Sequence, residues 1–278
     1  MYRTLIQAED LVRHLDDAGW VVVDCRHDLA DHQAGRRAHL DGHIPGAGFA
    51  DMESDLSAAK TPGSGRHPLP SPAHLVAVFS RLGIGDDTQV VAYDAAGGMM
   101  AARLWWLLRY MGHETVAVLD GGWPCWRQAG YPVVSGEEHR APEEFHGQPC
   151  HGRVVETAAV LEQARLIDAR DPARYRGEIE PLDPVAGHIP GALNYFCRNN
   201  LDEQGRFRDP AALQAQFARV FGDTPAENAV FYCGSGVTAC HNILAAVHAG
   251  FPQSRLYPGS WSEWCADPSR PVAVGEAR

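Results

Sequence analysis

Apolar residues along the chain form two kinds of segment that alternate. Residues 21–25, 89–94 and 115–120 are short and almost continuously apolar, as strands buried on both faces of a parallel sheet are. Residues 99–112 and 237–250 carry apolar side chains three and four positions apart and end in glycine, which is typical of amphipathic helices. This alternation predicts an α/β fold with an open, mostly parallel sheet flanked by helices.

The pattern of the first half recurs in the second half. Four landmarks repeat in the same order and at nearly constant spacing, which indicates a duplicated domain. The paired segments are 21–26 and 166–170 (VVVDCR and LIDAR), 42–47 and 187–192 (both GHIPGA), 89–94 and 228–233 (QVVAYD and NAVFYC), and 119–126 and 257–264 (LDGGWPCW and YPGSWSEW).

The polar segment 135–150 between the copies has neither helical nor strand periodicity, so it is predicted to be a linker. We therefore expect a first domain at residues 1–136, a linker at 137–151 and a second domain at 152–278. Each half has about 130 residues, an ordinary size for one domain.

Charge and composition narrow the class of protein. The 278 residues include 24 Lys and Arg against 35 Asp and Glu, a formal net charge of −11. This acidic balance argues against a nucleic-acid partner, because nonspecific binding requires a basic face. No run of about 18 apolar residues exists to span a bilayer. The first twenty residues also lack the apolar core of a signal peptide, so we expect a cytoplasmic protein without a membrane partner.

The seven cysteines are too sparse for a disulfide-stabilised scaffold, and free thiols are expected. No CxxC pair or Cys/His cluster has the spacing of a zinc site, so neither a metal nor another cofactor is predicted. One thiol therefore remains a candidate for direct chemistry.

The two copies differ where the third landmark ends, because the first has Asp94 and the second has Cys233. A glycine-containing loop after Cys233 leads directly into a predicted helix. Backbone N–H groups and the helix dipole converge in such a turn, which favours a reactive thiolate near neutral pH. The loop residues, which we predict to bind the substrate, are Gly234, Ser235, Gly236, Val237 and Thr238.

A buried small hydrophobe is the alternative for Cys233, as it is for most lone cysteines. A phosphatase is excluded, since its Cys-x5-Arg motif requires an arginine to clamp phosphate and Ala239 stands at that position. Cys240, two helical turns further on, is expected to face the core.

The duplicated GHIPGA segments, the two Trp-x-x-Trp turns and the loop CGSGVTAC together resemble the two-domain rhodanese superfamily of sulfurtransferases over nearly the whole chain. The resemblance implies that Cys233 takes a sulfur atom from a small anionic donor as a persulfide and passes it to cyanide, a thiol or a thioredoxin-like acceptor. The CGSGV loop is similar to that of 3-mercaptopyruvate sulfurtransferases. Thiosulfate is the alternative donor.

The resemblance also implies roles for residues outside the loop. Ser235 and His43, with Asp31 as the acid, are expected to protonate the leaving group, and Arg174 to bind the donor's anionic group. Family members usually carry a second arginine where this chain has Leu182, and Arg176 or Arg198 is a candidate replacement. His188 and the strand-ending Asp24 and Asp168 are expected to be structural.

Two further readings stay open at this point. Rhodanese-like domains also serve as non-catalytic binding modules or persulfide carriers, a role that the copy with Asp94 is expected to have. A peroxide-sensing thiol would use the same reactive Cys233, although no helical spacing marks a resolving cysteine. The oligomeric state does not follow from the sequence.

Overall fold

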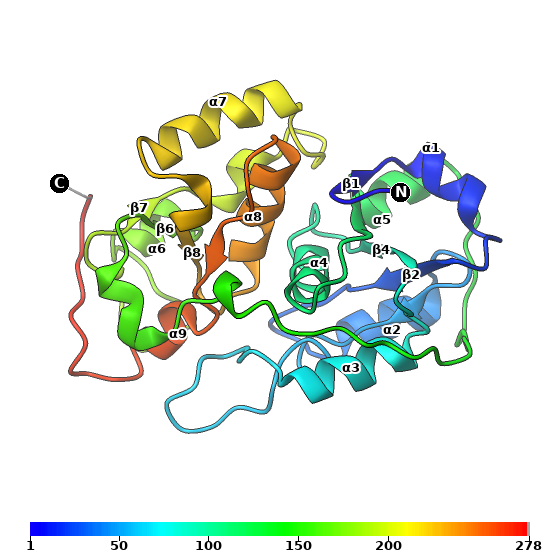
Figure 1. The fold of residues 1–278 in the computed structure, drawn as a ribbon, viewed down its shortest axis with the longest axis horizontal. Coiled ribbons are helices and arrows are strands. Elements are labelled where there is room, and N and C mark those ends of the chain that lie inside the picture. The colour runs from blue at the N-terminus through cyan, green and yellow to red at the C-terminus, as the bar shows by residue number, and fades with distance from the viewer. Residues whose placement is uncertain (277–278) are drawn as a thin grey trace. The chain divides into compact units, whose positions relative to one another are not determined.

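The computed structural model describes residues 1–276, which form two compact units, each built on a parallel sheet flanked by helices (Figure 1). Unit 1 comprises Met1–Ala58, Pro70–Cys150 and Glu203–Phe207. Unit 2 comprises Ala59–Leu69, His151–Asp202 and the chain from Arg208 onward. The units thus follow the two sequence halves except for two short segments, 59–69 and 203–207, each of which belongs to the unit of the other half.

Unit 1 contains a five-stranded sheet in the order β1-β5-β4-β2-β3, with every pair parallel. Its strands are β1 (Leu5–Ile6), β2 (Trp20–Asp24), β3 (Gly48–Phe49), β4 (Gln89–Tyr93) and β5 (Val116–Leu119). Its α-helices are α1 (Ala8–Leu11), α2 (Ala34–Asp41), α3 (Pro72–Arg81), α4 (Ala101–Tyr110) and α5 (Gly122–Gln128), and a 3-10 turn covers Val12–His14.

Unit 2 contains a four-stranded parallel sheet in the order β7-β6-β8-β9. Its strands are β6 (Leu166–Asp168), β7 (Leu193–Asn194), β8 (Val230–Tyr232) and β9 (Arg255–Leu256). Its α-helices are α6 (Pro172–Tyr175), α7 (Pro210–Phe221), α8 (Thr238–His248) and α9 (Ser260–Trp264), and 3-10 turns cover His151–Arg153, Thr157–Glu162, Cys197–Asn200 and Ala226–Asn228.

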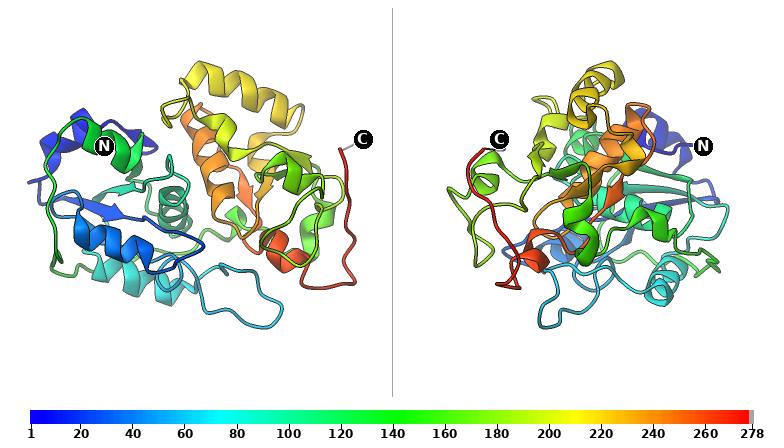
Figure 2. Two further views of the ribbon diagram at one scale, coloured as in Figure 1. Left: turned by 180° about the vertical axis from the view of Figure 1, so that it is seen from behind. Right: turned by 60° about the vertical axis from the view of Figure 1, so that its left-hand side comes forward.

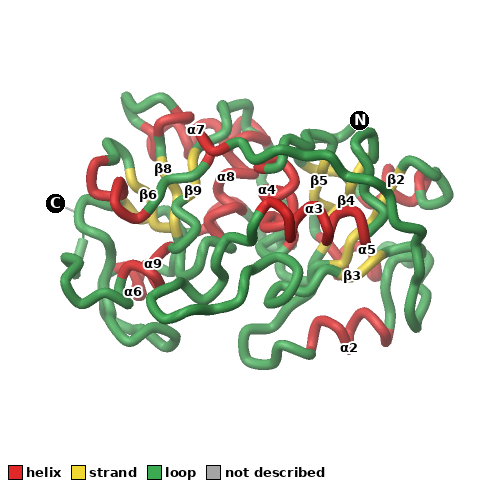
Figure 3. The backbone as a smooth tube through the Cα atoms, turned by 60° about the horizontal axis from the view of Figure 1, so that its bottom comes forward, coloured by secondary structure: helices red, strands yellow, loops and turns green. Residues whose placement is uncertain are grey.

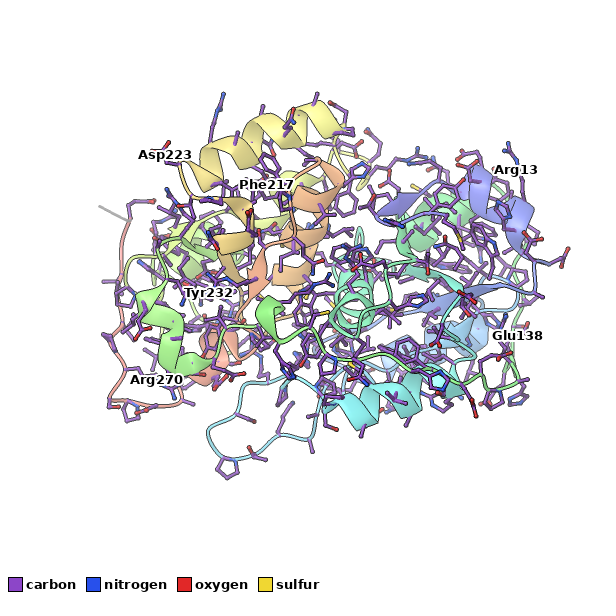
Figure 4. All side chains as sticks on the ribbon, in the orientation of Figure 1. Arg13, Glu138, Phe217, Asp223, Tyr232 and Arg270 are labelled. Atoms are coloured by element: carbon purple, nitrogen blue, oxygen red, sulfur yellow. The ribbon has the colours of Figure 1, made fainter. Side chains whose placement is uncertain are left out.

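The strands lie between helices in each unit, as Figure 3 shows, and the central strands β4 and β8 are fully buried. Helices α7 and α8 pack side by side in unit 2 (Figure 2). Phe217 of α7 contributes to the core there, with its ring 6.3 Å from that of Phe231 (Figure 4). Among residues 1–276, no helix is both long and apolar enough to cross a membrane.

Local sequence explains where the long helices begin. Ser71 and Asp209 precede α3 and α7, and each side chain accepts a hydrogen bond from a backbone N–H of the first turn. A proline occupies the first position of both helices, where its missing N–H costs nothing. Helix α8 has no side-chain cap, because its start is formed by the loop that follows Cys233.

A buried aspartate–arginine pair joins the first landmark strand to the GHIPGA segment in both units. In unit 1, Arg26 Nη2 lies 2.5 Å from Asp24 Oδ2 and donates to the Gly42 carbonyl at 2.7 Å. In unit 2, Arg170 Nη2 makes the same contacts with Asp168 and the Gly187 carbonyl, at 2.7 and 2.6 Å. The two aspartates are structural, as the sequence predicts.

A tryptophan covers each of these arginines. The Arg26 guanidinium lies 4.5 Å from the Trp123 ring centroid, and Arg170 lies 4.7 Å from that of Trp261. Burial opposes ionisation of Asp24, but the bonds from His39 and Arg26 outweigh it and lower the pKa of this carboxyl. These shared contacts account for the recurrence of the GHIPGA and Trp landmarks.

Arg26→Met should lower the free energy of unfolding by about 3–5 kcal/mol, because it leaves the Asp24 carboxylate buried without its main partner. Urea denaturation followed by circular dichroism measures the change. Adding Asp24→Asn to this variant should recover part of the loss. The control is Arg13→Met, whose side chain is 72% exposed (Figure 4) and whose loss should cost less than about 0.5 kcal/mol. Equal losses for Arg26→Met and Arg13→Met would contradict the assignment.

Candidate functional site

Cys233 directly follows β8, and the start of α9 holds its backbone on both sides. The Cys233 N–H donates to Ser260 Oγ at 3.1 Å, and the Cys233 carbonyl accepts from the Trp261 N–H at 3.0 Å. The residue is 2% exposed. Its position is therefore fixed by the last landmark turn rather than by the strand alone.

Ser260 has an unusual backbone conformation that bears on this contact. Its φ of 56° makes it the one non-glycine residue among 1–276 with a positive φ. Gly122 occupies the matching place in unit 1 with a φ of 54°. A left-handed conformation costs a residue with a side chain about 1–2 kcal/mol. Unit 2 thus keeps a strained serine whose hydroxyl accepts the N–H of Cys233 and donates to the Tyr257 carbonyl at 3.0 Å.

Two glycines shape the loop after Cys233. Gly236 has a φ of 77°, and a Cβ there would lie 2.4 Å from the Pro258 carbonyl oxygen. A Cβ on Gly234 would lie 2.6 Å from Nη2 of Arg66 and 3.7 Å from Nη1 of Arg174. The absence of a side chain at Gly234 therefore lets two guanidinium groups approach the loop beside the nucleophile.

The corresponding turn in unit 1 shows what such a loop binds. The Asp94 carboxylate accepts hydrogen bonds at 2.6–2.9 Å from four backbone N–H groups of its own turn and of the start of α4. The donors are Ala96, Gly98, Met100 and Ala101. A turn between a strand and a helix in this fold therefore presents converging donors to one anion. In unit 2 the residue at this strand end is Cys233, which replaces the carboxylate with a sulfur atom.

Ser235 pairs with a histidine that the sequence analysis missed. Its hydroxyl lies 2.7 Å from Nδ1 of His67, and the two residues are 7% and 2% exposed. His67 lies on the segment Ala59–Leu69, which comes from the first half of the chain but belongs to unit 2. In Figure 1 this light-blue segment runs toward α9, where the Arg66 N–H donates to Ser262 Oγ at 3.0 Å.

A sequence signal for this segment exists. Gly65-Arg66-His67 recurs as Gly205-Arg206-Phe207, and residues 203–207 belong to unit 1 in turn. The Phe207 N–H donates to Asp120 at 2.8 Å, and its ring lies against Gly98 of the turn after Asp94. The copies therefore differ at two positions of this arrangement, because unit 2 has Cys233 and His67 where unit 1 has Asp94 and Phe207.

The structure places the guanidinium groups of Arg174 and Arg66 beside the loop. Arg174 donates to both oxygens of Glu180, at 3.1 and 2.6 Å, and lies 3.4 Å from Asp183. Arg66 pairs with the other oxygen of Asp183. Arg176, a candidate replacement for the arginine missing at Leu182, instead pairs with Glu178 and Glu276.

The structure gives His43 and Asp31 partners other than Ser235. His43 is 0% exposed, its Nδ1 lies 2.7 Å from the His39 carbonyl, and its ring stacks on His39 at 4.0 Å. His188 is held similarly, with Nδ1 2.8 Å from the Tyr175 carbonyl. Both histidines thus make the same kind of buried contact with a backbone carbonyl, and the histidine that lies at Ser235 is His67.

Asp31 lies at the surface, where it pairs with Arg37 and accepts the Gln33 N–H at 3.1 Å. The bond from Arg37, assisted by that from Gln33, lowers the pKa of Asp31. An exposed carboxylate held in this way is a poor proton donor near neutral pH, and its partners give it a local structural role.

The remaining loop residues lead into α8. Val237 is buried at 4% exposure, and Thr238 is the first residue of the helix. Cys240 faces inward, where its Sγ donates to the Gly236 carbonyl at 3.2 Å. Burial raises the pKa of Cys197 to about 12 and that of Cys265 to about 11, and it raises that of Cys25 well above the usual value. These three cysteines are therefore neutral thiols at neutral pH.

Comparison with known proteins shows that both halves of the chain belong to one domain family. The model of the rhodanese-like domain matches residues 7–129 and 154–267. A probable 3-mercaptopyruvate sulfurtransferase from Pseudomonas aeruginosa is 47% identical, with 98% of each chain covered. A putative thiosulfate sulfurtransferase from Mycobacterium tuberculosis is 42% identical, over 98% of this chain and 94% of the relative. A 3-mercaptopyruvate sulfotransferase structure from Escherichia coli superposes with a TM-score of 0.79 at 32% identity, covering 94% of this chain and all of the other.

The strain at Ser260 predicts a difference between two variants that both lose the hydroxyl. Ser260→Gly and Ser260→Ala should each be destabilised by about 1–3 kcal/mol, because the buried N–H of Cys233 loses its acceptor. Glycine tolerates the positive φ, so Ser260→Gly should be more stable than Ser260→Ala by about 1 kcal/mol. Chemical denaturation of both variants measures this difference, and an alanine variant as stable as the glycine variant would argue against strain.

Proposed function

Since this chain belongs to the rhodanese family and is a sulfurtransferase, we propose that it takes sulfur from 3-mercaptopyruvate and carries it as a persulfide on Cys233. The observation that supports this donor is the Ser235–His67 pair beside the nucleophile. A donor whose sulfur is bonded to carbon leaves behind a carbanion equivalent, which requires a proton. Ser235 and His67 are close enough to pass one between them.

In the first step, the Cys233 thiolate attacks the sulfur of 3-mercaptopyruvate. The new S–S bond forms as the donor's C–S bond breaks, and the electron pair of that bond leaves as the enolate of pyruvate. The enolate takes a proton from the Ser235–His67 pair and becomes pyruvate. The donor's thiol proton stays on the outer sulfur, so Cys233 becomes a neutral persulfide that can then ionise.

In the second step, a thiolate or cyanide attacks the outer sulfur. The S–S bond breaks, and the Cys233 thiolate is restored as the persulfide proton is released. We expect the backbone N–H groups of the loop after Cys233 to stabilise the anionic sulfur in both steps, as those of the matching turn in unit 1 bind the Asp94 carboxylate. The guanidinium groups of Arg66 and Arg174 bind the donor's carboxylate.

Thiosulfate is the second candidate donor. Its sulfane sulfur leaves sulfite, a stable anion that needs no proton, so this reaction uses the same Cys233 persulfide without Ser235 or His67. The acceptors we propose are cyanide, small thiols and thioredoxin-like proteins. We also propose a cytoplasmic location, where a reducing environment keeps the cysteines as thiols.

Cys233→Ser should abolish thiocyanate formation from cyanide with either donor, because a hydroxyl cannot form the persulfide. Mass spectrometry of the wild-type protein incubated with donor alone should show a gain of about 32 Da, one sulfur atom, on the peptide that contains Cys233. Cys150→Ser, at a partly exposed cysteine in unit 1, is the control and should retain activity. Turnover by Cys233→Ser would disprove the assignment of the nucleophile. Sulfur loading without repeated turnover would favour a persulfide carrier instead.

His67→Asn and Ser235→Ala should separate the two donors. Removing the proton path should reduce kcat/KM for 3-mercaptopyruvate by about 10²–10⁴-fold, the usual contribution of general acid catalysis. The value for thiosulfate should change much less, since sulfite leaves without a proton. Steady-state assays with saturating cyanide give both constants. His43→Asn controls for loss of a buried histidine that we assign to structure. Equal losses for both donors would contradict the proton-transfer role of Ser235 and His67.

A further inference from the structure

Two buried carboxylates surround the guanidinium groups beside the Cys233 loop. Glu180 and Asp183 are each 3% exposed, and both lie on the loop that follows α6. The carboxylate of Glu180 accepts hydrogen bonds from Nε and Nη2 of Arg174, and these two bonds fix the plane of the guanidinium. Asp183 reaches both arginines: one oxygen pairs with Arg66 and the other lies 3.4 Å from Nη2 of Arg174.

The charges of this cluster balance. Arg66 and Arg174 carry two positive charges against the two negative charges of Glu180 and Asp183. Arg170, which also contacts Glu180 at 3.3 Å, is matched by Asp168 at 2.7 Å. A donor therefore enters a neutral cluster rather than a strongly positive one. An anionic donor must therefore compete with Glu180 and Asp183 for the hydrogen bonds of the two guanidinium groups.

Asp183 lies between the two arginines, because one of its oxygens faces Arg66 and the other faces Arg174. Burial raises the pKa of Asp183, and Glu180 adds to the rise while Arg66 and Arg174 oppose it. Its negative charge is thus already poorly accommodated, and a second anion close by adds repulsion in a poorly solvated setting. Glu180 differs from Asp183 in its role, because its two hydrogen bonds with Arg174 orient the arginine side chain.

We propose that Asp183 is a specificity-determining residue that limits the charge of the donor, favouring a monoanion such as 3-mercaptopyruvate over a dianion such as thiosulfate. This inference rests on the proposed function. Its physical basis is repulsion: the carboxylate of Asp183 opposes two charges more strongly than one, which is discrimination by an unfavourable contact. Both donors form the same persulfide on Cys233, and the effect that we propose for Asp183 is on donor binding.

Asp183→Asn tests the proposal because it removes the charge and keeps an oxygen that can accept from Arg66. The ratio of kcat/KM for thiosulfate to that for 3-mercaptopyruvate, with cyanide as acceptor, should rise roughly tenfold, the size expected when one charge is removed at short range in a protein site. The rise should come mainly from a lower KM for thiosulfate. Asp183→Glu keeps the charge and should keep the wild-type preference.

The control is Asp223→Asn, which makes the same change in net charge at an exposed position just after α7 (Figure 4). Its ratio should equal that of the wild type. If Asp183→Asn does not fold, Asp183→Ser removes the same charge with a smaller side chain and answers the same question. An unchanged or lower ratio in a folded, charge-free variant would overturn the proposal. A wild-type protein that forms no thiocyanate from either donor would instead refute the proposed function.

Discussion

The turn between a strand and the following helix is the constraint on which the rest of this structure depends. In unit 1 it gathers four backbone N–H groups around the Asp94 carboxylate, so the anion that satisfies them is part of the chain. In unit 2 the same strand end has Cys233, whose side chain carries a negative charge only as a thiolate or persulfide. This difference between the copies leaves the turn of unit 2 without the carboxylate that fills the turn of unit 1.

Three parts of unit 2 contribute to the arrangement around Cys233. The landmark turn at Ser260 fixes the backbone of Cys233, the loop glycines admit Arg66 and Arg174, and the segment 59–69 brings His67 to Ser235. Unit 1 retains the same scaffold but has Phe207 where unit 2 has His67. Unit 1 therefore has a phenyl ring where unit 2 has the imidazole that we propose as a proton carrier. Because unit 1 also has Asp94 in place of Cys233, we assign the proposed chemistry to unit 2 alone.

Electrostatics near the site differ from those of the whole chain. The net charge of −11 repels anionic donors at long range, and the cluster of Arg66, Arg174, Glu180 and Asp183 is neutral rather than positive. Binding must therefore come from short, directed hydrogen bonds of guanidinium and backbone N–H groups. In this arrangement, the strength of donor binding depends on how many negative charges the donor carries.

The sequence by itself determined the duplication, the α/β class and the structural role of Asp24 and Asp168. It also marked Cys233 as the candidate nucleophile. Buried strands, repeated landmarks and a difference between the copies are all local patterns that can be read along the chain. Only the tertiary structure decided the partners of that nucleophile. The GHIPGA motif suggested His43 as the partner of Ser235, but the His43 ring is bonded to the His39 carbonyl. The histidine that contacts Ser235 is His67, 168 residues away along the chain. The tertiary structure also brings Arg66 to the Cys233 loop, whereas the sequence has Leu182 where a second arginine was expected. Spacing along the chain does not reveal such pairs, since two segments, 59–69 and 203–207, each join the unit of the other half.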